Sequence, residues 1–352
     1  MSSAFRRAAA LLSILTACLL GAPASSQAPA PGATAQEVRF ASDPGTTLAG
    51  TLEMPSGSGG GRRPVVVIIS GTGPWTRGGW VNIRARLHAG GIATLMYDKR
   101  GQGQSTGTFV DTIPAMERDV AAAVAFLRTR PDVDPARIAL MGTSQGAVAA
   151  PLVASRDPVI AAVVMLSGPV GPRGELFLGI LRAHLMSAGK NPAQVDTVAA
   201  AVARWMEARS RNAGAAEVTR LREAAVAAFA DVGFPRAQAE GFAATLDNDV
   251  VLSMFEAAPA PALASLRAPI LAIYGSSDDV IAPSLSVEAA AAALRDNEDA
   301  LVMVVPGMTH ELTRAMVPAG EAPREDGTMP VVTEMIGAWL AKRLSTGALE
   351  GR

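Results

Sequence analysis

Short, uninterrupted runs of apolar residues recur along most of the chain, and turn residues bound each of them. The first long run, at 65–69, reads Val-Val-Val-Ile-Ile and ends at Ser70 and Gly71. An apolar run without polar alternation is typical of a strand that is buried on both faces. Comparable runs occur at Ala93–Tyr97, Ile138–Met141, Ile160–Leu166, Ile270–Tyr274 and Leu301–Val305.

Stretches with helical spacing separate most of these runs, for example Ile113–Arg128 and Ser286–Leu294. Buried strands that alternate with helices predict an α/β fold, in which helices cover both faces of a mostly parallel sheet. Ahead of this pattern, Val38–Phe40 and Thr47–Leu52 are expected to form two short strands, since the turn sequence Asp-Pro-Gly separates them.

One interval of about a hundred residues breaks the alternation because it contains no strand-like run. The segment 173–263 is rich in Ala, Leu, Glu and Arg, and Val198–Arg209 and Val218–Ala230 have helical periodicity. We expect a helical insertion over 173–263, which divides the sheet domain into a first part at 38–172 and a second part at 264–345.

The N-terminus has the pattern of an export signal. Two arginines precede the apolar run Ala8–Leu20, and the small residues at 22–24 follow it. A run of this length is too short to span a bilayer comfortably. We therefore expect residues 1–24 to be a signal peptide and the Ala-, Pro- and Ser-rich stretch 25–37 to be a linker. An uncleaved N-terminal anchor is the alternative.

The single cysteine, Cys18, lies inside this leader. Its context, Leu-Thr-Ala-Cys, resembles a bacterial lipobox, in which the cysteine becomes lipidated. Cleavage near Ala24 and lipidation at Cys18 both remain open, and either predicts a periplasmic or secreted protein. Contact with a membrane is expected only for the lipidated form. The mature domain has no disulfide and no catalytic cysteine.

The composition excludes several classes of function. Hydrophobic residues make up 49% of the chain and charged residues 18%, which is typical of a folded protein. The net charge of −1 gives no basic excess for nucleic-acid binding. Zinc-site and Walker motifs are absent from the sequence, and the glycines at 101–103 do not form a dinucleotide fingerprint. We expect no cofactor and no metal.

Candidate chemistry centres on the strand-like run Ile138–Met141, which leads into Gly-Thr-Ser-Gln-Gly at 142–146 and then a helix-like stretch. A serine on a sharp strand-to-helix turn exposes its hydroxyl above the sheet. Glycines on both sides remove Cβ atoms that would meet neighbouring backbone. The helix that follows points its N-terminal N–H groups at the reacting carbonyl. Ser144 is therefore the predicted nucleophile.

This segment resembles the nucleophile elbow of the α/β-hydrolase superfamily, whose members include serine esterases and serine aminopeptidases with a helical cap. Residues 97–105 are similar to the D-x-R-G-x-G-x-S loop of that fold, and residues 70–74 to its oxyanion loop. Ser70 departs from the pattern because a histidine, which supports the loop, is common there. The resemblance covers roughly 65–340 apart from the insertion. It implies the α/β-hydrolase fold with an inserted helical cap, and a triad in the chain order Ser, acid, His.

The chain contains three histidines, and one of them fits this order. His310 follows the last buried run and is the predicted base. His88 is expected on the surface of a short helix, and His184 lies in the helical insertion. For the acid, Asp278 has the family's G-x-x-D-x-x-V spacing after the run 270–274, and the neighbouring Asp279 is its competitor.

The oxyanion that develops during acyl transfer needs fixed N–H donors. The backbone N–H of Gln145 is one predicted donor, and the resemblance places the second at Thr72. Asp98 and Arg100 are expected to tie down their own loop.

Together these residues predict a serine hydrolase of small carboxylic esters. A serine aminopeptidase on the same fold is the main rival, and would need an acidic residue such as Glu175, Glu207 or Glu240 to hold a free amine. A non-catalytic binding protein is the third possibility. The expected ligand is a small ester or a peptide-like molecule.

Eight apolar residues of the insertion could line an acyl pocket or instead form the insertion's own core. They are Met186, Trp205, Met206, Phe229, Phe234, Phe242, Met254 and Phe255.

Overall fold

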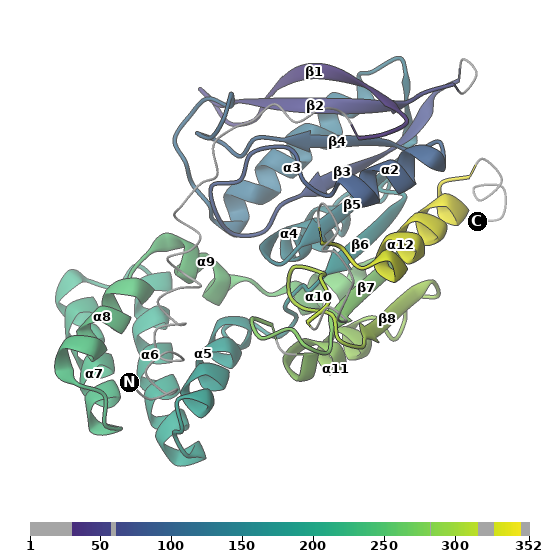
Figure 1. Ribbon diagram of the computed structural model, residues 1–352. Helices are drawn as coiled ribbons and strands as arrows, with labels where there is room; N and C mark the ends of the chain where they lie inside the picture. Colours follow the sequence, from purple (N-terminus) through teal and green to yellow (C-terminus); the bar gives the residue numbers. More distant parts are fainter. Residues whose placement is uncertain (1–29, 58–60, 282, 316–326, 346–352) are drawn as a thin grey trace. The chain divides into compact units, whose positions relative to one another are not determined.

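The computed structural model of the protein describes residues 30–57, 61–281, 283–315 and 327–345 (Figure 1). The predicted signal peptide at 1–24, with both processing positions, lies outside these residues. The described chain forms two compact units. The helical unit comprises Gly171–Ala258, and the sheet unit comprises the chain up to Val170 and from Pro259 onward.

The sheet unit is built on one eight-stranded sheet with the order β1-β2-β4-β3-β5-β6-β7-β8. The strand β2 runs antiparallel to its neighbours β1 and β4, and the pairs from β4 through β8 are parallel. The strands are β1 (Ala33–Ala41), β2 (Thr47–Pro55), β3 (Arg63–Ile69), β4 (Ala93–Tyr97), β5 (Val133–Thr143), β6 (Ala162–Leu166), β7 (Ile270–Gly275) and β8 (Ala300–Val305). The prediction of a mostly parallel sheet is confirmed.

The N-terminal strand is longer than the sequence suggested. We expected a linker at 25–37, yet β1 begins at Ala33 and pairs with β2 along its full length, from Ala33 opposite Pro55 to Ala41 opposite Thr47. The cause is tertiary: pairing with a neighbouring strand satisfies the backbone of a segment whose own composition is typical of a linker.

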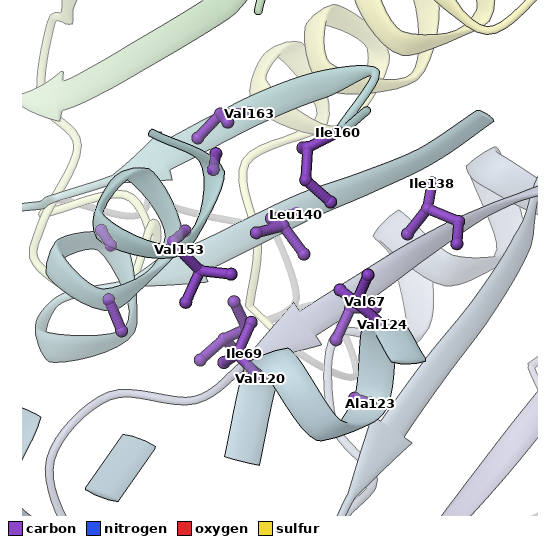
Figure 2. Packing of buried hydrophobic residues seen from close by; sticks show 14 of the residues in the cluster. Val67, Ile69, Val120, Ala123, Val124, Ile138, Leu140, Val153, Ile160 and Val163 are labelled. Carbon is purple, nitrogen blue, oxygen red and sulfur yellow. The ribbon is translucent and has the colours of Figure 1, made fainter. Parts of the chain in front are cut away.

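Helices cover both faces of this sheet, as expected. They are α2 (Val81–Ala89), α3 (Ile113–Arg128), α4 (Gln145–Ala154), α10 (Pro259–Ser265), α11 (Pro283–Ala293) and α12 (Pro330–Arg343). Successive residues of β3 explain the uninterrupted apolar runs. Val67 and Ile69 pack with α3 and α4 on one face (Figure 2), whereas Val66 and Ile68 pack with α2 and α12 on the other.

The helical insertion consists of α5 (Glu175–Ser187), α6 (Pro192–Ser210), α7 (Ala215–Asp231), α8 (Arg236–Leu246) and α9 (Asp249–Glu256). It has a hydrophobic core of its own, which contains six of the eight residues considered for a pocket: Trp205, Met206, Phe229, Phe234, Phe242 and Phe255. Met186, in contrast, is 50% exposed. Most of the insertion's large apolar side chains therefore stabilise the insertion itself.

His88 is buried, contrary to the surface position expected from the sequence. Its Nε2 lies 3.1 Å from Thr94 Oγ1 and 3.5 Å from Glu53 Oε2, and Glu53 forms a buried ion pair with Arg84. Burial lowers the pKa of His88, although the Glu53 carboxylate opposes this effect. Polar and apolar residues are spread almost evenly around α2, so the sequence does not indicate which side of this helix faces the sheet.

Along the described part of the chain, no helix is long and apolar enough to cross a bilayer.

The packing of the sheet unit leads to a matched test on two strand leucines. Leu140 on β5 is fully buried, whereas Leu301 on the edge strand β8 is 44% exposed. Leu140→Ala should lower the free energy of unfolding by about 2 to 5 kcal/mol because it leaves a cavity in the core. Leu301→Ala should change it by less than about 0.5 kcal/mol. Chemical denaturation measures both, and equal effects would contradict the assigned core.

Candidate active site

Ser144 lies on a strained turn between β5 and α4. Its backbone has φ 53° and ψ −118°, a conformation that L-residues rarely adopt and that costs about 1 to 3 kcal/mol. Two backbone hydrogen bonds hold the turn: Ser144 N–H donates to the carbonyl of Leu166 (2.9 Å), and Ala147 N–H donates to that of Ser144 (3.0 Å). The strain is thus maintained by the ends of two adjacent strands and the first turn of a helix.

The two glycines of the elbow are required by close backbone contacts. A Cβ atom on Gly142 would lie 2.1 Å from the carbonyl oxygen of Gly146. A Cβ atom on Gly146 would lie 2.5 Å from the carbonyl oxygen of Ile69 and 2.8 Å from that of Ser70. Because these glycines lack Cβ atoms, α4 can begin directly against the end of β3, where the predicted oxyanion loop starts.

Asp278 and His310 form a hydrogen-bonded pair after β7 and β8. Asp278 Oδ2 lies 2.9 Å from His310 Nδ1, and Asp278 Oδ1 accepts the backbone N–H groups of Val280 (2.9 Å) and Ile281 (2.7 Å). The Asp278 side chain is fully buried, whereas Asp279 is exposed. A carboxylate only accepts hydrogen bonds, so this contact favours the tautomer that carries the proton on Nδ1 and leaves Nε2 with a lone pair.

The loop after β8 folds back over the end of β7 to bring His310 into this position. Ser277 N–H donates to the carbonyl of Met308 at 3.0 Å, and a Cβ atom on Gly275 would lie 2.1 Å from that same oxygen. Glycine at 275 is therefore a consequence of the close approach of the His310 loop. The imidazole keeps 12% of its surface exposed, which leaves it accessible to a reactant.

Ser144 and the Asp278–His310 pair lie at the same, carboxyl edge of the sheet, with β6 between β5 and β7. Among the described residues, no hydrogen bond joins Ser144 Oγ to His310. In serine hydrolases this bond is often long without substrate and shortens in the reacting complex. The geometry therefore brings Asp278 and His310 together and places Ser144 at the same edge of the sheet.

The loop after β3 approaches Ser144 from the opposite side. A Cβ atom on Gly71 would lie 3.1 Å from Ser144 Cβ, so the backbone of this loop is in contact with the elbow. Thr72, the next residue, is half-buried, and its carbonyl accepts the indole N–H of Trp75 at 2.8 Å. Gln145, which carries the other predicted donor, is buried at the first position of α4.

A buried ion pair that sequence reasoning missed supports this loop. Lys99 Nζ donates to Asp111 Oδ1 and to the carbonyl of Gly71, and Asp111 Oδ2 accepts the N–H of Gly73 at 2.7 Å. Burial raises the pKa of Asp111, and Lys99 opposes that effect. Lys99 belongs to the motif at 97–105, which is a signal in the sequence, whereas no sequence pattern marks Asp111.

Asp98 and Arg100 hold the neighbouring loop. Asp98 accepts the backbone N–H groups of Arg77 and Gln104, each at 2.8 Å. Arg100 pairs with Asp119 and Asp43 at 2.7 Å and 2.6 Å. Both side chains thus hold neighbouring segments of the sheet unit together.

The three acidic residues considered for amine binding all have partners inside the insertion. The pairs are Glu175 with Arg182, Glu207 with Arg173, and Glu240 with Arg236. Within the described ranges, no group of three or more His, Cys, Asp or Glu side chains could hold a metal ion.

Two helical glycines give opposite expectations for the same substitution. Gly146→Ala in α4 should lower the free energy of unfolding by about 1 to 3 kcal/mol, because its Cβ would meet backbone that cannot move easily. Gly241→Ala in α8 meets nothing within 4 Å and should raise stability by about 0.5 to 1 kcal/mol. Urea unfolding distinguishes the two variants. An unchanged free energy of unfolding in Gly146→Ala would contradict the close backbone contact at this position.

Curated relatives match part of the chain. Thiohydrolase apmlB of Arthrinium phaeospermum is 32% identical over 174 residues, which are 46% of this chain and 55% of that protein. Uncharacterized protein Rv2307c of Mycobacterium tuberculosis is 37% identical over 109 residues, 31% of this chain and 37% of that protein. The chain spans about half the length, or less, of the curated relatives that it matches.

Solved structures with the same fold cover nearly the whole chain. Hypothetical protein PA2218 from Pseudomonas aeruginosa has a TM-score of 0.59 at 20% identity and covers 91% of this chain and 98% of its own. The Pyrococcus furiosus esterase Pf2001 has 0.57 at 15%, covering 92% and 96%. Est1E from Butyrivibrio proteoclasticus, with ferulic acid bound, has 0.51 at 18%, covering 87% and 99%. At these identities the likeness concerns the fold.

The family model Hydrolase_4, described as serine aminopeptidase, S33, matches residues 60–315, which include the elbow, the oxyanion loop and the Asp278–His310 pair. The chain is therefore a member of the Hydrolase_4 (serine aminopeptidase, S33) family and has the α/β-hydrolase fold.

Proposed function

We propose that the protein hydrolyses small carboxylic esters through an acyl-enzyme intermediate on Ser144. The observation that carries the proposal is the buried Asp278–His310 pair, 2.9 Å apart, at the same sheet edge as a serine on a strained elbow. A serine hydroxyl is a weak nucleophile near neutral pH, and a base oriented by a carboxylate is what activates it.

In acylation, Ser144 Oγ attacks the ester carbonyl carbon while His310 Nε2 takes the hydroxyl proton. Asp278 holds the imidazole in the required tautomer and stabilises the imidazolium that forms. The N–H groups of Gln145 and Thr72 donate to the oxyanion of the tetrahedral intermediate. The intermediate collapses, the bond to the alkoxy oxygen breaks, and the alcohol leaves with the proton from His310.

Deacylation uses the same groups on water. His310 Nε2 takes a proton from the attacking water, and the water oxygen bonds to the acyl carbon. A second tetrahedral intermediate forms on the same two N–H donors. When the bond to Ser144 Oγ breaks, His310 returns the proton to the serine, and the carboxylic acid is released.

Two observations favour an ester over the N-terminus of a peptide as the substrate. Glu175, Glu207 and Glu240 each form an ion pair with an arginine of the insertion, so a substrate amine would have to compete with that arginine. Similar proteins of known structure include esterases, and a curated relative is a thiohydrolase. A small ester or thioester therefore fits better than an aminoacyl amide. Because the sequence predicts a signal peptide at 1–24, we propose that this chemistry takes place outside the cytoplasm.

The nucleophile is tested by ester hydrolysis with Ser144→Ala. The mature protein is assayed on p-nitrophenyl esters from acetate through octanoate, and on aminoacyl p-nitroanilides. Loss of the serine should lower turnover by about 10⁶-fold, because the covalent route disappears. Equal rates in the two proteins would remove Ser144 from the mechanism. Activity on the anilides alone would favour the aminopeptidase instead.

The acid is tested by two neighbouring aspartates. Asp278→Asn should lower kcat by about 10⁴-fold, because an amide holds the wrong imidazole tautomer. Asp279→Asn, at an exposed position, serves as the matched control and should leave kcat unchanged. A fall of similar size in both variants, or in Asp279→Asn alone, would reassign the acid.

A further inference from the structure

We propose that the buried Lys99–Asp111 ion pair is a positioning device for the oxyanion hole, which aligns and polarises the peptide that carries the Thr72 N–H. The inference rests on the proposed function, because it concerns how the predicted donors are held. It assigns a part in the reaction to two residues that do not touch the substrate.

The first step of the argument is the direction of one peptide group. Lys99 Nζ donates to the carbonyl oxygen of Gly71 at 2.5 Å. That oxygen and the Thr72 N–H belong to the same peptide, and the described chain has no cis peptide bonds. In a trans peptide the C=O and N–H bonds point in opposite directions. An ammonium fixed on the oxygen side therefore fixes the N–H on the other side.

The second step is electrostatic. Hydrogen bonds in series polarise one another, and a positive charge at the carbonyl oxygen strengthens the N–H of that peptide as a donor. The effect is larger where water is excluded, and the Lys99 and Asp111 side chains are only 11% and 5% exposed. Lys99 thus raises the donor strength of Thr72 without contacting the oxyanion.

The third step is that Asp111 is bonded to both sides of the site. Its Oδ2 accepts the N–H of Gly73, on the far side of Thr72 from the Lys99 contact, at 2.7 Å. Its own carbonyl accepts Nε2 of Gln145, the residue with the other predicted donor, also at 2.7 Å. One residue therefore links the segments that carry both N–H groups, and this linkage sets the distance between them.

The pair also accounts for the departure at Ser70. The resemblance implies a loop-supporting histidine there, and in this chain Lys99 holds the same loop through its hydrogen bond to the Gly71 carbonyl. Because a buried ion pair with one member removed is costly, loss of Lys99 alone would also reduce stability. A test must therefore separate the effect on the reaction from the effect on folding.

The test compares Lys99→Met with the double variant Lys99→Met/Asp111→Asn. The double variant removes the unpaired carboxylate and should recover stability, but it still lacks the charge on the Gly71 carbonyl. The matched control is Arg84→Met, which breaks the Glu53–Arg84 pair, whose side chains are 4% and 5% exposed. Two readouts are used: hydrolysis of p-nitrophenyl esters, and the rate at which a fluorophosphonate labels Ser144, which needs no knowledge of the natural substrate.

We expect both Lys99 variants to lose about 10- to 100-fold in kcat and in labelling rate with KM little changed, which is less than the loss of a whole donor. The double variant should regain thermal stability without regaining kcat. Arg84→Met should lose stability and keep both rates at the wild-type level.

Wild-type rates in Lys99→Met, or recovery of kcat together with stability in the double variant, would overturn the positioning role and leave the triad intact. A wild-type protein that neither hydrolyses esters nor reacts with the fluorophosphonate at Ser144 would instead overturn the proposed function, and the positioning role with it.

Discussion

Close backbone approach at the carboxyl edge of the sheet is the constraint on which the rest of the site depends. β3 and β5 pair in register, with Ile69 opposite Gly142, so the oxyanion loop and the nucleophile elbow begin at the same level. A Cβ atom on Gly146 would lie 2.5 Å from the carbonyl of Ile69, which leaves room only for glycine. The parallel sheet thus determines which loops meet, and the glycines determine how closely they meet.

The same constraint explains why the charged groups of the site are fully bonded. Backbone that packs this closely excludes water, so a buried carboxylate must find its partners within the protein. Asp278 accepts two backbone N–H groups and the imidazole of His310, and Asp111 accepts Lys99 and the N–H of Gly73. Each carboxylate therefore holds a loop in place through its hydrogen bonds.

The sequence was most informative where one residue type alone satisfies a local constraint. The apolar runs predicted the strands, since a strand covered on both faces leaves no polar position. The run Leu301–Val305 was wrongly expected to be buried, because β8 is an edge strand on which Leu301 and Val304 are exposed. The glycines around Ser144 predicted the elbow, since only glycine fits where the backbone segments lie this close together. The family order selected His310, which follows the last strand, and the family spacing selected Asp278. In the structure these two side chains are 2.9 Å apart.

Interactions between distant segments could not be predicted in this way. The Lys99–Asp111 pair and the burial of His88 against Glu53 depend on how loops and helices pack, and neither leaves a periodic pattern in the sequence. The start of β1 at Ala33 is similar, because only its pairing with β2 distinguishes it from a linker. Polar residues that stabilise one another across the fold look, in one sequence, like ordinary surface residues.

The residues proposed for the chemistry all belong to the sheet unit, whereas the insertion has a hydrophobic core of its own. Ser144, Asp278, His310 and the Lys99–Asp111 pair lie in the chain up to Val170 or from Pro259 onward. The aromatic residues of Gly171–Ala258 form that unit's own core, and its acidic residues considered for amine binding pair with its own arginines. The positions of the donors and the base are therefore determined by contacts within the sheet unit. Among the described residues, the core side chains of the insertion take no part in the hydrogen bonds that hold Asp278, His310 or the oxyanion loop, so substitutions of these side chains should act on stability.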